Sequence, residues 1–413
     1  MATKVIASHR SSEYKSGLDD DGFIDDFLSF PEIGDADQTS IEVQLNGDMG
    51  PWDFVSGIYY FEEDGGNDQD PTIFLGGPGT FTLTQEVESV AIYGNVGFDV
   101  SDAFRLSFGV RFTDDEKTAA IEINDDPATS VNDPLISESA SDDWSETSFE
   151  LSATYDFDNG MNMYGTVQTG YQSGQFPARP FCLFGFLDFT QPGNVSRPNC
   201  FVGQDDNITA TNYEVGIKGQ PWDGFQMSAA VFFTNYEDLP YQVSETTATG
   251  FDTSNLIVEQ DSFGFEWEST AFITDNFLFH ATLGYIDVDV EEQGGVKPVA
   301  PLTPELTFSI SPEARIPMDG GGELVLRADY SYRDDMYGEP SSDPGRFTQI
   351  DSRGLVNFDI AYHSPDRDWS ASLYGRNVTD EEYDNARLNT GDYVLIMLNN
   401  DASEFGVRLT KRF

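Results

Sequence analysis

The chain has 413 residues, of which 73 are Asp or Glu and 21 are Lys or Arg, so its formal net charge is −52. This acidity argues against nucleic-acid binding, which needs a basic face, and against docking on anionic lipid through a basic patch. Intrinsic disorder is excluded as well, because aromatic residues make up 14% of the sequence and include 33 Phe and 18 Tyr.

The first residues, 1–10, contain no apolar h-region or cleavage site, so we expect no signal peptide in this sequence. No run of about 18 apolar residues occurs, which argues against a transmembrane helix. The acidic segment 19–24 resembles the middle of an EF-hand loop, but Gly17 and Leu28 stand where calcium ligands are required. We therefore expect a solvated acidic loop there, with weak Ca²⁺ binding as the alternative.

Period-two alternation of apolar and polar residues is the main local signal, and it predicts β-strands. In 104–113, Phe, Leu and Val alternate with mostly polar residues, and the segments 225–234, 277–285, 324–333 and 356–362 repeat the pattern. An apolar face with aromatic residues toward its ends suits lipid and its interfaces, and the polar face would line a wet lumen.

The connections between these strands alternate between short and long. Short turns are predicted at 47–51, 99–102, 158–160, 219–224, 274–276, 317–321 and 364–368. Long polar segments lie at 11–37, 62–84, 113–141, 172–208, 238–258, 287–300, 333–347 and 378–402. This order is typical of outer-membrane barrels, with short periplasmic turns and long extracellular loops. We predict an all-β, antiparallel transmembrane β-barrel of about sixteen strands, in preference to a soluble sandwich or propeller.

The segment 172–208 contains both cysteines, Cys182 and Cys200. In an exported chain we expect them to form one disulfide within the loop, and the alternative is a pair of unlinked thiols. The segment is also rich in aromatic residues, which include Phe176, Phe181, Phe184, Phe186 and Phe189. These either pack around the disulfide or form an apolar ligand-contacting surface at the mouth.

Candidate ligand contacts lie where the preceding strand meets this loop. They are Tyr171, Gln172, Gln175, Phe176, Phe181 and Phe184. Other acid-rich segments, such as 114–116 and 380–382, favour a solvated exterior. The alternative is a negative field that attracts cationic ligands or metal chelates to the mouth.

Catalytic and cofactor motifs are missing from the sequence. It has three His without metal-ligand spacing, no Gly-x-Ser-x-Gly elbow and no phosphate-binding Gly-Lys-Ser/Thr loop. We therefore expect neither enzyme activity nor a metal or other cofactor.

The final segment, 404–413, is an alternating strand that stops on Phe413. A terminal aromatic strand is what barrel closure needs, so we predict Phe413 as a barrel-insertion signal for the barrel-assembly machinery. Lys411 is the exception, because it stands where the alternation calls for an apolar residue.

Four segments resemble the C-terminal barrel of TonB-dependent outer-membrane receptors. Residues 164–176 are similar to the strand that enters a Gly-Tyr/Phe-Lys-Ser-Gly-Gly-Phe motif, with Gln172 and Gln175 in place of Lys and Gly. Residues 211–219 (Thr-Asn-Tyr-Glu-Val-Gly-Ile-Lys-Gly) and 229–239 resemble the family's Tyr-Glu-x-Gly-x-Lys strand and its hairpin partner. Residues 375–383 resemble the Asn-Leu-Thr-Asp-x-x-Tyr segment.

The resemblance implies an outer-membrane receptor that imports a scarce small molecule, most often a ferric siderophore. Such barrels have 22 strands and a plug that TonB pulls, so 1–413 is expected to be one N-terminally truncated barrel domain. We expect the signal peptide, TonB box, plug and first strands to be missing, so TonB would act only through a plug absent here. The alternatives are a stand-alone sixteen-strand porin and an inactive fragment.

Overall fold

The computed structural model describes residues 1–19, 28–74, 77–124, 136–176, 205–247, 250–293, 297–389, 394–398 and 402–412. This part of the chain is almost entirely β-structure, with one short 3₁₀ helix, η1 (Pro344–Arg346). Among the helices of the described residues, none has the length and apolar character needed to cross a membrane.

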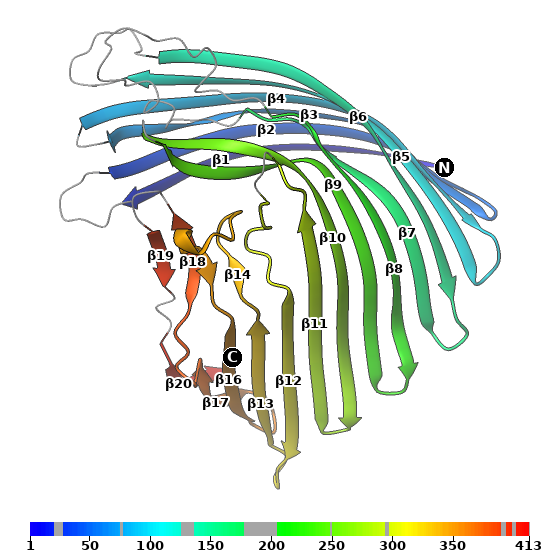
Figure 1. Cartoon of the computed structure of the whole chain (residues 1–413). Coiled ribbons are helices and arrows are strands. Elements are labelled where there is room, and N and C mark those ends of the chain that lie inside the picture. Colours follow the sequence, from blue (N-terminus) through cyan, green and yellow to red (C-terminus); the bar gives the residue numbers. More distant parts are fainter. Residues whose placement is uncertain are drawn as a thin grey trace.

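Sixteen strands form a single antiparallel sheet (Figure 1). In sheet order they are β1 (Ala2–Asp19), β2 (Leu28–Met49), β3 (Trp52–Phe74), β4 (Gly77–Asp99), β5 (Phe104–Asn124), β6 (Ile136–Asp156), β7 (Met161–Gln172), β8 (Ile208–Trp222), β9 (Phe225–Thr247), β10 (Gly250–Thr274), β11 (Phe277–Val290), β12 (Leu306–Pro317), β13 (Glu323–Arg333), β16 (Arg353–His363), β17 (Trp369–Arg376) and β20 (Glu404–Lys411). This confirms the predicted all-β antiparallel architecture and its strand number.

All seven predicted short turns connect neighbouring strands, and they gather along one rim of the sheet, the turn end (Figure 1). The long connections gather at the opposite rim, the loop end. Four short strands lie within two of the long connections: β14 (Met336–Tyr337) pairs with β15 (Gln349–Ile350), and β18 (Asp384–Asn389) pairs with β19 (Val394–Leu398).

Several long connections are shorter than the sequence predicts, because strand pairing continues into them. β1 and β2 pair as far as Asp19 and Ser29, and β3 and β4 as far as Phe74 and Gly77. The segments 113–141 and 238–258 are likewise mostly strand. Residues 11–37 and 62–79 show little alternation between apolar and polar residues, which is the signal that predicted strands elsewhere, and the alternation at 80–84 and 239–243 extends over only a few residues.

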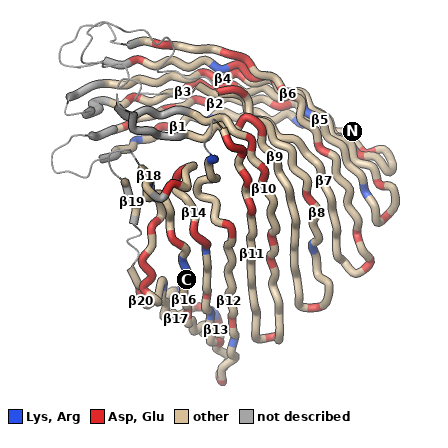
Figure 2. The backbone as a smooth tube through the Cα atoms, in the orientation of Figure 1, with Lys and Arg blue, Asp and Glu red and all other residues tan. Residues whose placement is uncertain are grey.

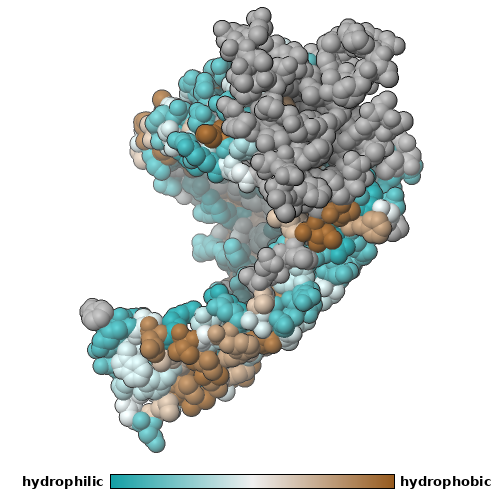
Figure 3. Space-filling view, turned by 90° about the vertical axis from the view of Figure 1, so that its left-hand side faces the viewer, coloured by the Kyte–Doolittle hydropathy of each residue, from teal (hydrophilic) through white to brown (hydrophobic). Residues whose placement is uncertain are grey.

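The sheet is strongly curved but open. In the described residues β1 pairs with β2 alone and β20 with β17 alone. Figure 3, which is turned by 90° from the view of Figure 1, shows the two arms of this curve separated by a wide gap. The first strand begins, and the last ends, at the turn end, as the sequence predicts.

The register places one apolar face, the outer face, across all sixteen strands. Ile58 lies between Val43 and Ile92, and far along the sheet Leu373 lies opposite Val407. Each of these side chains is at least 45% exposed. An antiparallel sheet in water normally buries its apolar face, so this exposed one requires an apolar environment. The exception is again Lys411, which lies opposite Trp369 on the outer face.

On the opposite side, the inner face, tyrosines cover glycines of the neighbouring strand. Tyr164 lies opposite Gly216, and a Cβ on Gly216 would lie 2.5 Å from the tyrosine ring. The Tyr164 hydroxyl donates to Glu214 Oε1 at 2.5 Å. The arrangement recurs in two further strand pairs, as Tyr14 with Gly34 and Glu32, and as Tyr374 with Gly406 and Glu404. A glycine opposite an aromatic ring helps to fix strand register.

We expect Gly216→Val to lower the free energy of unfolding by about 1–3 kcal/mol, because the added side chain displaces the Tyr164 ring. Tyr164→Phe keeps the ring over Gly216 and loses only the hydroxyl hydrogen bond, so its cost should be about 1 kcal/mol. Urea unfolding in detergent, followed by tryptophan fluorescence, measures both. Equal stability of Gly216→Val and wild type would contradict the close packing.

Candidate functional site at the loop end

Lys117 lies on the inner face of β5, beyond the outer apolar segment of that strand. Its Nζ donates to the Gly174 carbonyl at 2.8 Å and lies 5.9 Å above the ring of Trp144, which is 6% exposed. Burial lowers the pKa of Lys117, and the carboxylates of Asp115 and Glu63 partly oppose this effect. A half-buried ammonium group therefore ties β5 to the end of β7 in a chain that has few cations.

Next to Lys117, two residues close the base of the connection between β7 and β8. Gln175 and Asp205 exchange backbone hydrogen bonds of 3.3 and 2.9 Å. Asp205 is 5% exposed, and its carboxylate accepts a 2.6 Å hydrogen bond from Asn255 of β10. The Phe176 ring lies 5.6 Å from that of Trp144. These contacts hold Gln175, Phe176 and Asp205 against the inner face.

The structure brings only some of the predicted site residues together. Gln175 and Phe176 belong to the closed base, whereas Gln172 is exposed at the end of β7, opposite Ile208. Tyr171 lies near Asp115, and burial together with this carboxylate raises the pKa of the tyrosine. A ligand-contacting role for these residues stays a prediction. Five residues lie outside the described ranges: Phe181, Phe184, Phe413 and the cysteines Cys182 and Cys200.

Sequence reasoning missed Lys117 and Trp144. The run Asp-Asp-Glu-Lys at 114–117 resembles a solvated charged turn. The alternation of β5 would have placed Lys117 correctly. The odd-numbered residues of this strand lie on the inner face from Arg105 onward, and Lys117 is one of them.

A small apolar cluster also lies on the inner face, at the loop end of β9–β11. Tyr241, Val258 and Val290 are each at most 8% exposed and pack together. The Tyr241 hydroxyl donates to Gln260, and burial raises the pKa of Tyr241 to about 12. The tyrosine therefore stays neutral through the physiological range. This cluster falls partly in a segment predicted to be a polar loop.

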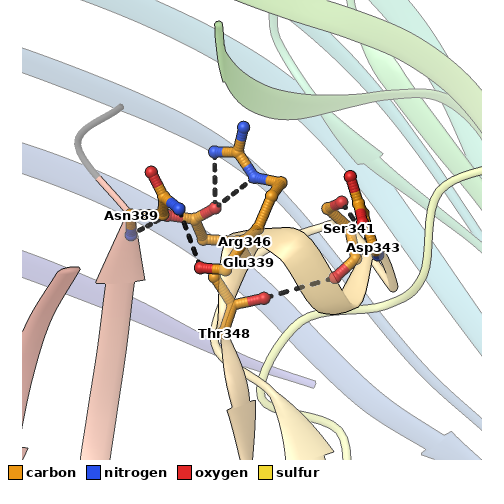
Figure 4. A network of polar contacts seen from close by, with 6 residues as sticks. All are labelled: Glu339, Ser341, Asp343, Arg346, Thr348 and Asn389. Atoms are coloured by element: carbon orange, nitrogen blue, oxygen red, sulfur yellow. Dashed lines mark hydrogen bonds and ion pairs between the residues drawn. The ribbon is translucent and has the colours of Figure 1, made fainter. Parts of the chain in front are cut away.

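A network centred on Glu339 joins two connections (Figure 4). Glu339 is 7% exposed and accepts hydrogen bonds from the Arg346 guanidinium, at 2.8 and 3.2 Å, and from the Asn389 backbone N–H. The Asn389 side chain donates to the Arg346 carbonyl at 2.7 Å. The connection between β13 and β16 is thereby bound to β18, which belongs to the connection between β17 and β20.

Further contacts extend this assembly. A Cβ on Gly338 would overlap the carbonyl oxygen of Arg387 in β18, so only glycine fits this close approach. The Leu302 N–H, from the connection between β11 and β12, donates to the Tyr337 carbonyl at 2.7 Å. Ile350 is fully buried. We call this assembly of β14, η1, β15 and β18 the loop unit.

Acidic residues dominate the loop halves of β2–β6 and of β9–β10 (Figure 2). Among the described residues no group of three or more His, Cys, Asp or Glu side chains is arranged to hold a metal ion. The loop end is therefore a region of negative potential built from separate carboxylates.

Comparison with known protein families decides the classification. The family model described as TonB dependent receptor-like, beta-barrel matches residues 6–378, which is most of the chain. The chain belongs to the TonB-dependent receptor family. The proteins of this family are outer-membrane β-barrel receptors that transport solutes and are not enzymes, and this chain matches their barrel domain.

Solved structures of several uptake receptors and of a transporter are similar to this chain in fold. The ferric yersiniabactin uptake receptor FyuA from Yersinia pestis matches 98% of this chain with a TM-score of 0.78 and 17% identity. The siderophore receptor PiuA from Acinetobacter baumannii matches 99% with a TM-score of 0.68 and 16% identity. The copper transporter OprC matches 98% with a TM-score of 0.66 and 12% identity.

At these identities the similarity establishes the fold alone. The chain spans only part of each of these receptors, covering 58% of FyuA and 62% of both PiuA and OprC. A comparison with curated protein sequences finds no match.

We expect Glu339→Ala to loosen the loop unit, because it removes the acceptor of both the Arg346 guanidinium and the Asn389 N–H. Unpaired buried donors cost about 1–3 kcal/mol, so the Asn389 amide should exchange with solvent deuterium about tenfold to hundredfold faster. Asp343→Asn is the matched control, since Asp343 accepts a hydrogen bond only within its own turn, from Gly345 at 2.8 Å. Unchanged exchange at Asn389 in Glu339→Ala would show that the network does not hold the unit together.

Proposed function

We propose that this chain is the membrane-spanning barrel part of an outer-membrane receptor. The receptor would take up a scarce solute, an iron chelate, by TonB-energised transport. One observation carries the proposal: the outer apolar face that continues through sixteen registered strands, with every long connection at one end. The loop end would face the extracellular medium and the turn end the periplasm.

The outer face supports a location in lipid. Its alternate residues are apolar on every strand, and the ladder pairs the backbone groups between them, which is the condition for crossing hydrocarbon. Outer-membrane lipid is therefore the proposed surrounding medium, and the barrel-assembly machinery the proposed insertion partner. Brown, apolar atoms on the convex underside of the lower arm in Figure 3 are consistent with this orientation.

The two edge strands of the sheet, β1 and β20, indicate how the chain would fit into a whole receptor. Unpaired backbone groups along β1 and β20 would each cost several kcal/mol in hydrocarbon. We therefore propose that further strands complete the barrel, and that a plug within it would be the part on which TonB acts. A self-contained sixteen-strand porin is disfavoured, because it would require β1 and β20 to pair.

The proposed cargo follows from the family and from the loop end. The structural neighbours carry names that specify ferric yersiniabactin, siderophore and copper uptake. The loop unit and the closed base near Lys117 give this end of the barrel firmly held surfaces, which ligand recognition benefits from. The acidic surroundings attract cations and disfavour polyanionic chelates.

Uptake of ⁵⁵Fe from a panel of ferric chelates tests this proposal. We expect deletion of the gene to abolish uptake of at least one chelate, and loss of TonB to abolish it equally, since transport requires energy coupling. A small hydrophilic solute that enters through porins should be unaffected, which provides the control. Uptake that persists without TonB, or a steady open conductance from the purified chain in planar bilayers, would contradict the proposal.

A further inference from the structure

Two arginines face each other across neighbouring strands at the loop end. Arg333, the last residue of β13, lies directly opposite Arg353, the first residue of β16. Both are on the inner face, because their neighbours Tyr332 and Gly354 lie on the outer face. Like charges in directly opposite positions destabilise a sheet. The pairing is all the more unexpected in a chain with 73 acidic and only 21 basic residues.

Among the described residues, neither arginine has a carboxylate partner. Arg333 donates to the Asp351 backbone carbonyl at 3.1 Å, and its Nε is buried without a hydrogen-bond acceptor. The Arg353 guanidinium lies 4.2 Å from the centre of the Tyr383 ring and 3.4 Å from Asn385 Oδ1. A buried guanidinium N–H without an acceptor is costly in the absence of a ligand.

Ion pairing is the usual arrangement for arginines elsewhere in the described part of the chain. The paired arginines include Arg105, Arg315, Arg327, Arg346, Arg367, Arg376 and Arg387.

Two acids that follow Arg333 in the chain have other hydrogen-bond partners. Asp334 accepts the Tyr332 hydroxyl at 3.1 Å, and Asp335 accepts a 3.0 Å hydrogen bond from Gln349. The Arg333–Arg353 pair thus consists of two directly opposed cations, neither of which forms an ion pair within the described part of the chain.

We propose that Arg333 and Arg353 form a binding site for an oxyanion group, a carboxylate or a phosphate, on a ligand that enters from the loop end. Two guanidinium groups offer planar donor pairs that match such a group, and the bound anion would cancel their mutual repulsion. Tyr383 and Asn385 border the site, and they belong to the connection that Glu339 holds through Asn389.

This site refines the class of cargo, and the refinement rests on the proposed transport function. A chain of net charge −52 repels a polyanion before it reaches the mouth. The ligand is therefore a neutral or cationic molecule that carries one oxyanion group for the arginine pair. A metal chelate with a single free carboxylate has this character.

Thermal unfolding of the purified chain in detergent tests the site, with inorganic phosphate and acetate as separate probes and chloride of equal ionic strength as the reference. In wild type, each effective probe should raise the unfolding temperature. Arg333→Gln and Arg353→Gln should need about tenfold or more probe for the same rise, because each loses a charge-assisted hydrogen-bonding group. A response to acetate alone identifies a carboxylate ligand, a response to phosphate alone identifies a phosphorylated one, and a response to both supports a general oxyanion site.

Arg327→Gln is the matched control, because Arg327 is on the inner face of the same strand and pairs with Asp329 at 2.8 Å. In chloride, Arg327→Gln should unfold at a lower temperature, whereas Arg353→Gln should unfold at the wild-type temperature or above, since it relieves repulsion. Arg327→Gln should keep the wild-type response to the probes.

A wild type that responds to neither probe would overturn the proposal, as would a variant of the pair that keeps the full response. In chloride, an Arg353→Gln variant destabilised as much as Arg327→Gln would assign the pair a structural role instead. None of these results bears on TonB-dependent uptake, which the iron-uptake experiment decides separately.

Discussion

Continuous backbone pairing across sixteen strands, with alternate residues on opposite faces, is the constraint on which the other features of this chain depend. A shift of one residue in any ladder would exchange the outer and inner faces of that strand. Glycines opposite aromatic rings oppose such a shift, as Gly216 does beneath Tyr164. Because the register holds from β1 to β20, apolar side chains stay on one face and nearly all cationic and tyrosine-based polar contacts stay on the other.

The loop end depends on the same register. The ladder positions Lys117 to reach the end of β7, and it places Arg333 opposite Arg353. Above the strands, Glu339 and Asn389 bind two connections together without any strand pairing between β13 and β17. The result is a rim whose charge is strongly negative overall but which contains a few buried or half-buried cations at defined positions. Isolated cations in acidic surroundings can select a ligand by the sign of its charge and by where on the ligand the negative group lies.

The sequence predicted the strand segments whose outer face is apolar, because apolar and polar residues alternate there, as they do in Phe104–Phe112. It also placed all seven short turns. It did not predict how far β3 continues, because a strand without alternation, such as 62–70, resembles a polar loop. The contacts at Lys117, Tyr241 and Glu339 were missed for a different reason. Lys117 and Glu339 contact segments 57 and 50 residues away in the chain, and Tyr241 packs across the β9–β10 hairpin. Alternation can place Lys117 on the inner face, but it does not identify the partners of these residues, which depend on register and on loop packing.

The measurement that tests the two-faced sheet most directly is a nitroxide scan of residues 104–113 in β5, with the chain in lipid bilayers. Alternate placement predicts that labels at even positions collide preferentially with oxygen dissolved in the lipid, and that labels at odd positions collide preferentially with a water-soluble nickel chelate. The two accessibilities should therefore oscillate out of phase with a period of two residues. A uniform profile for both reagents, or oscillation in the opposite phase, would contradict the assignment of the outer face to lipid.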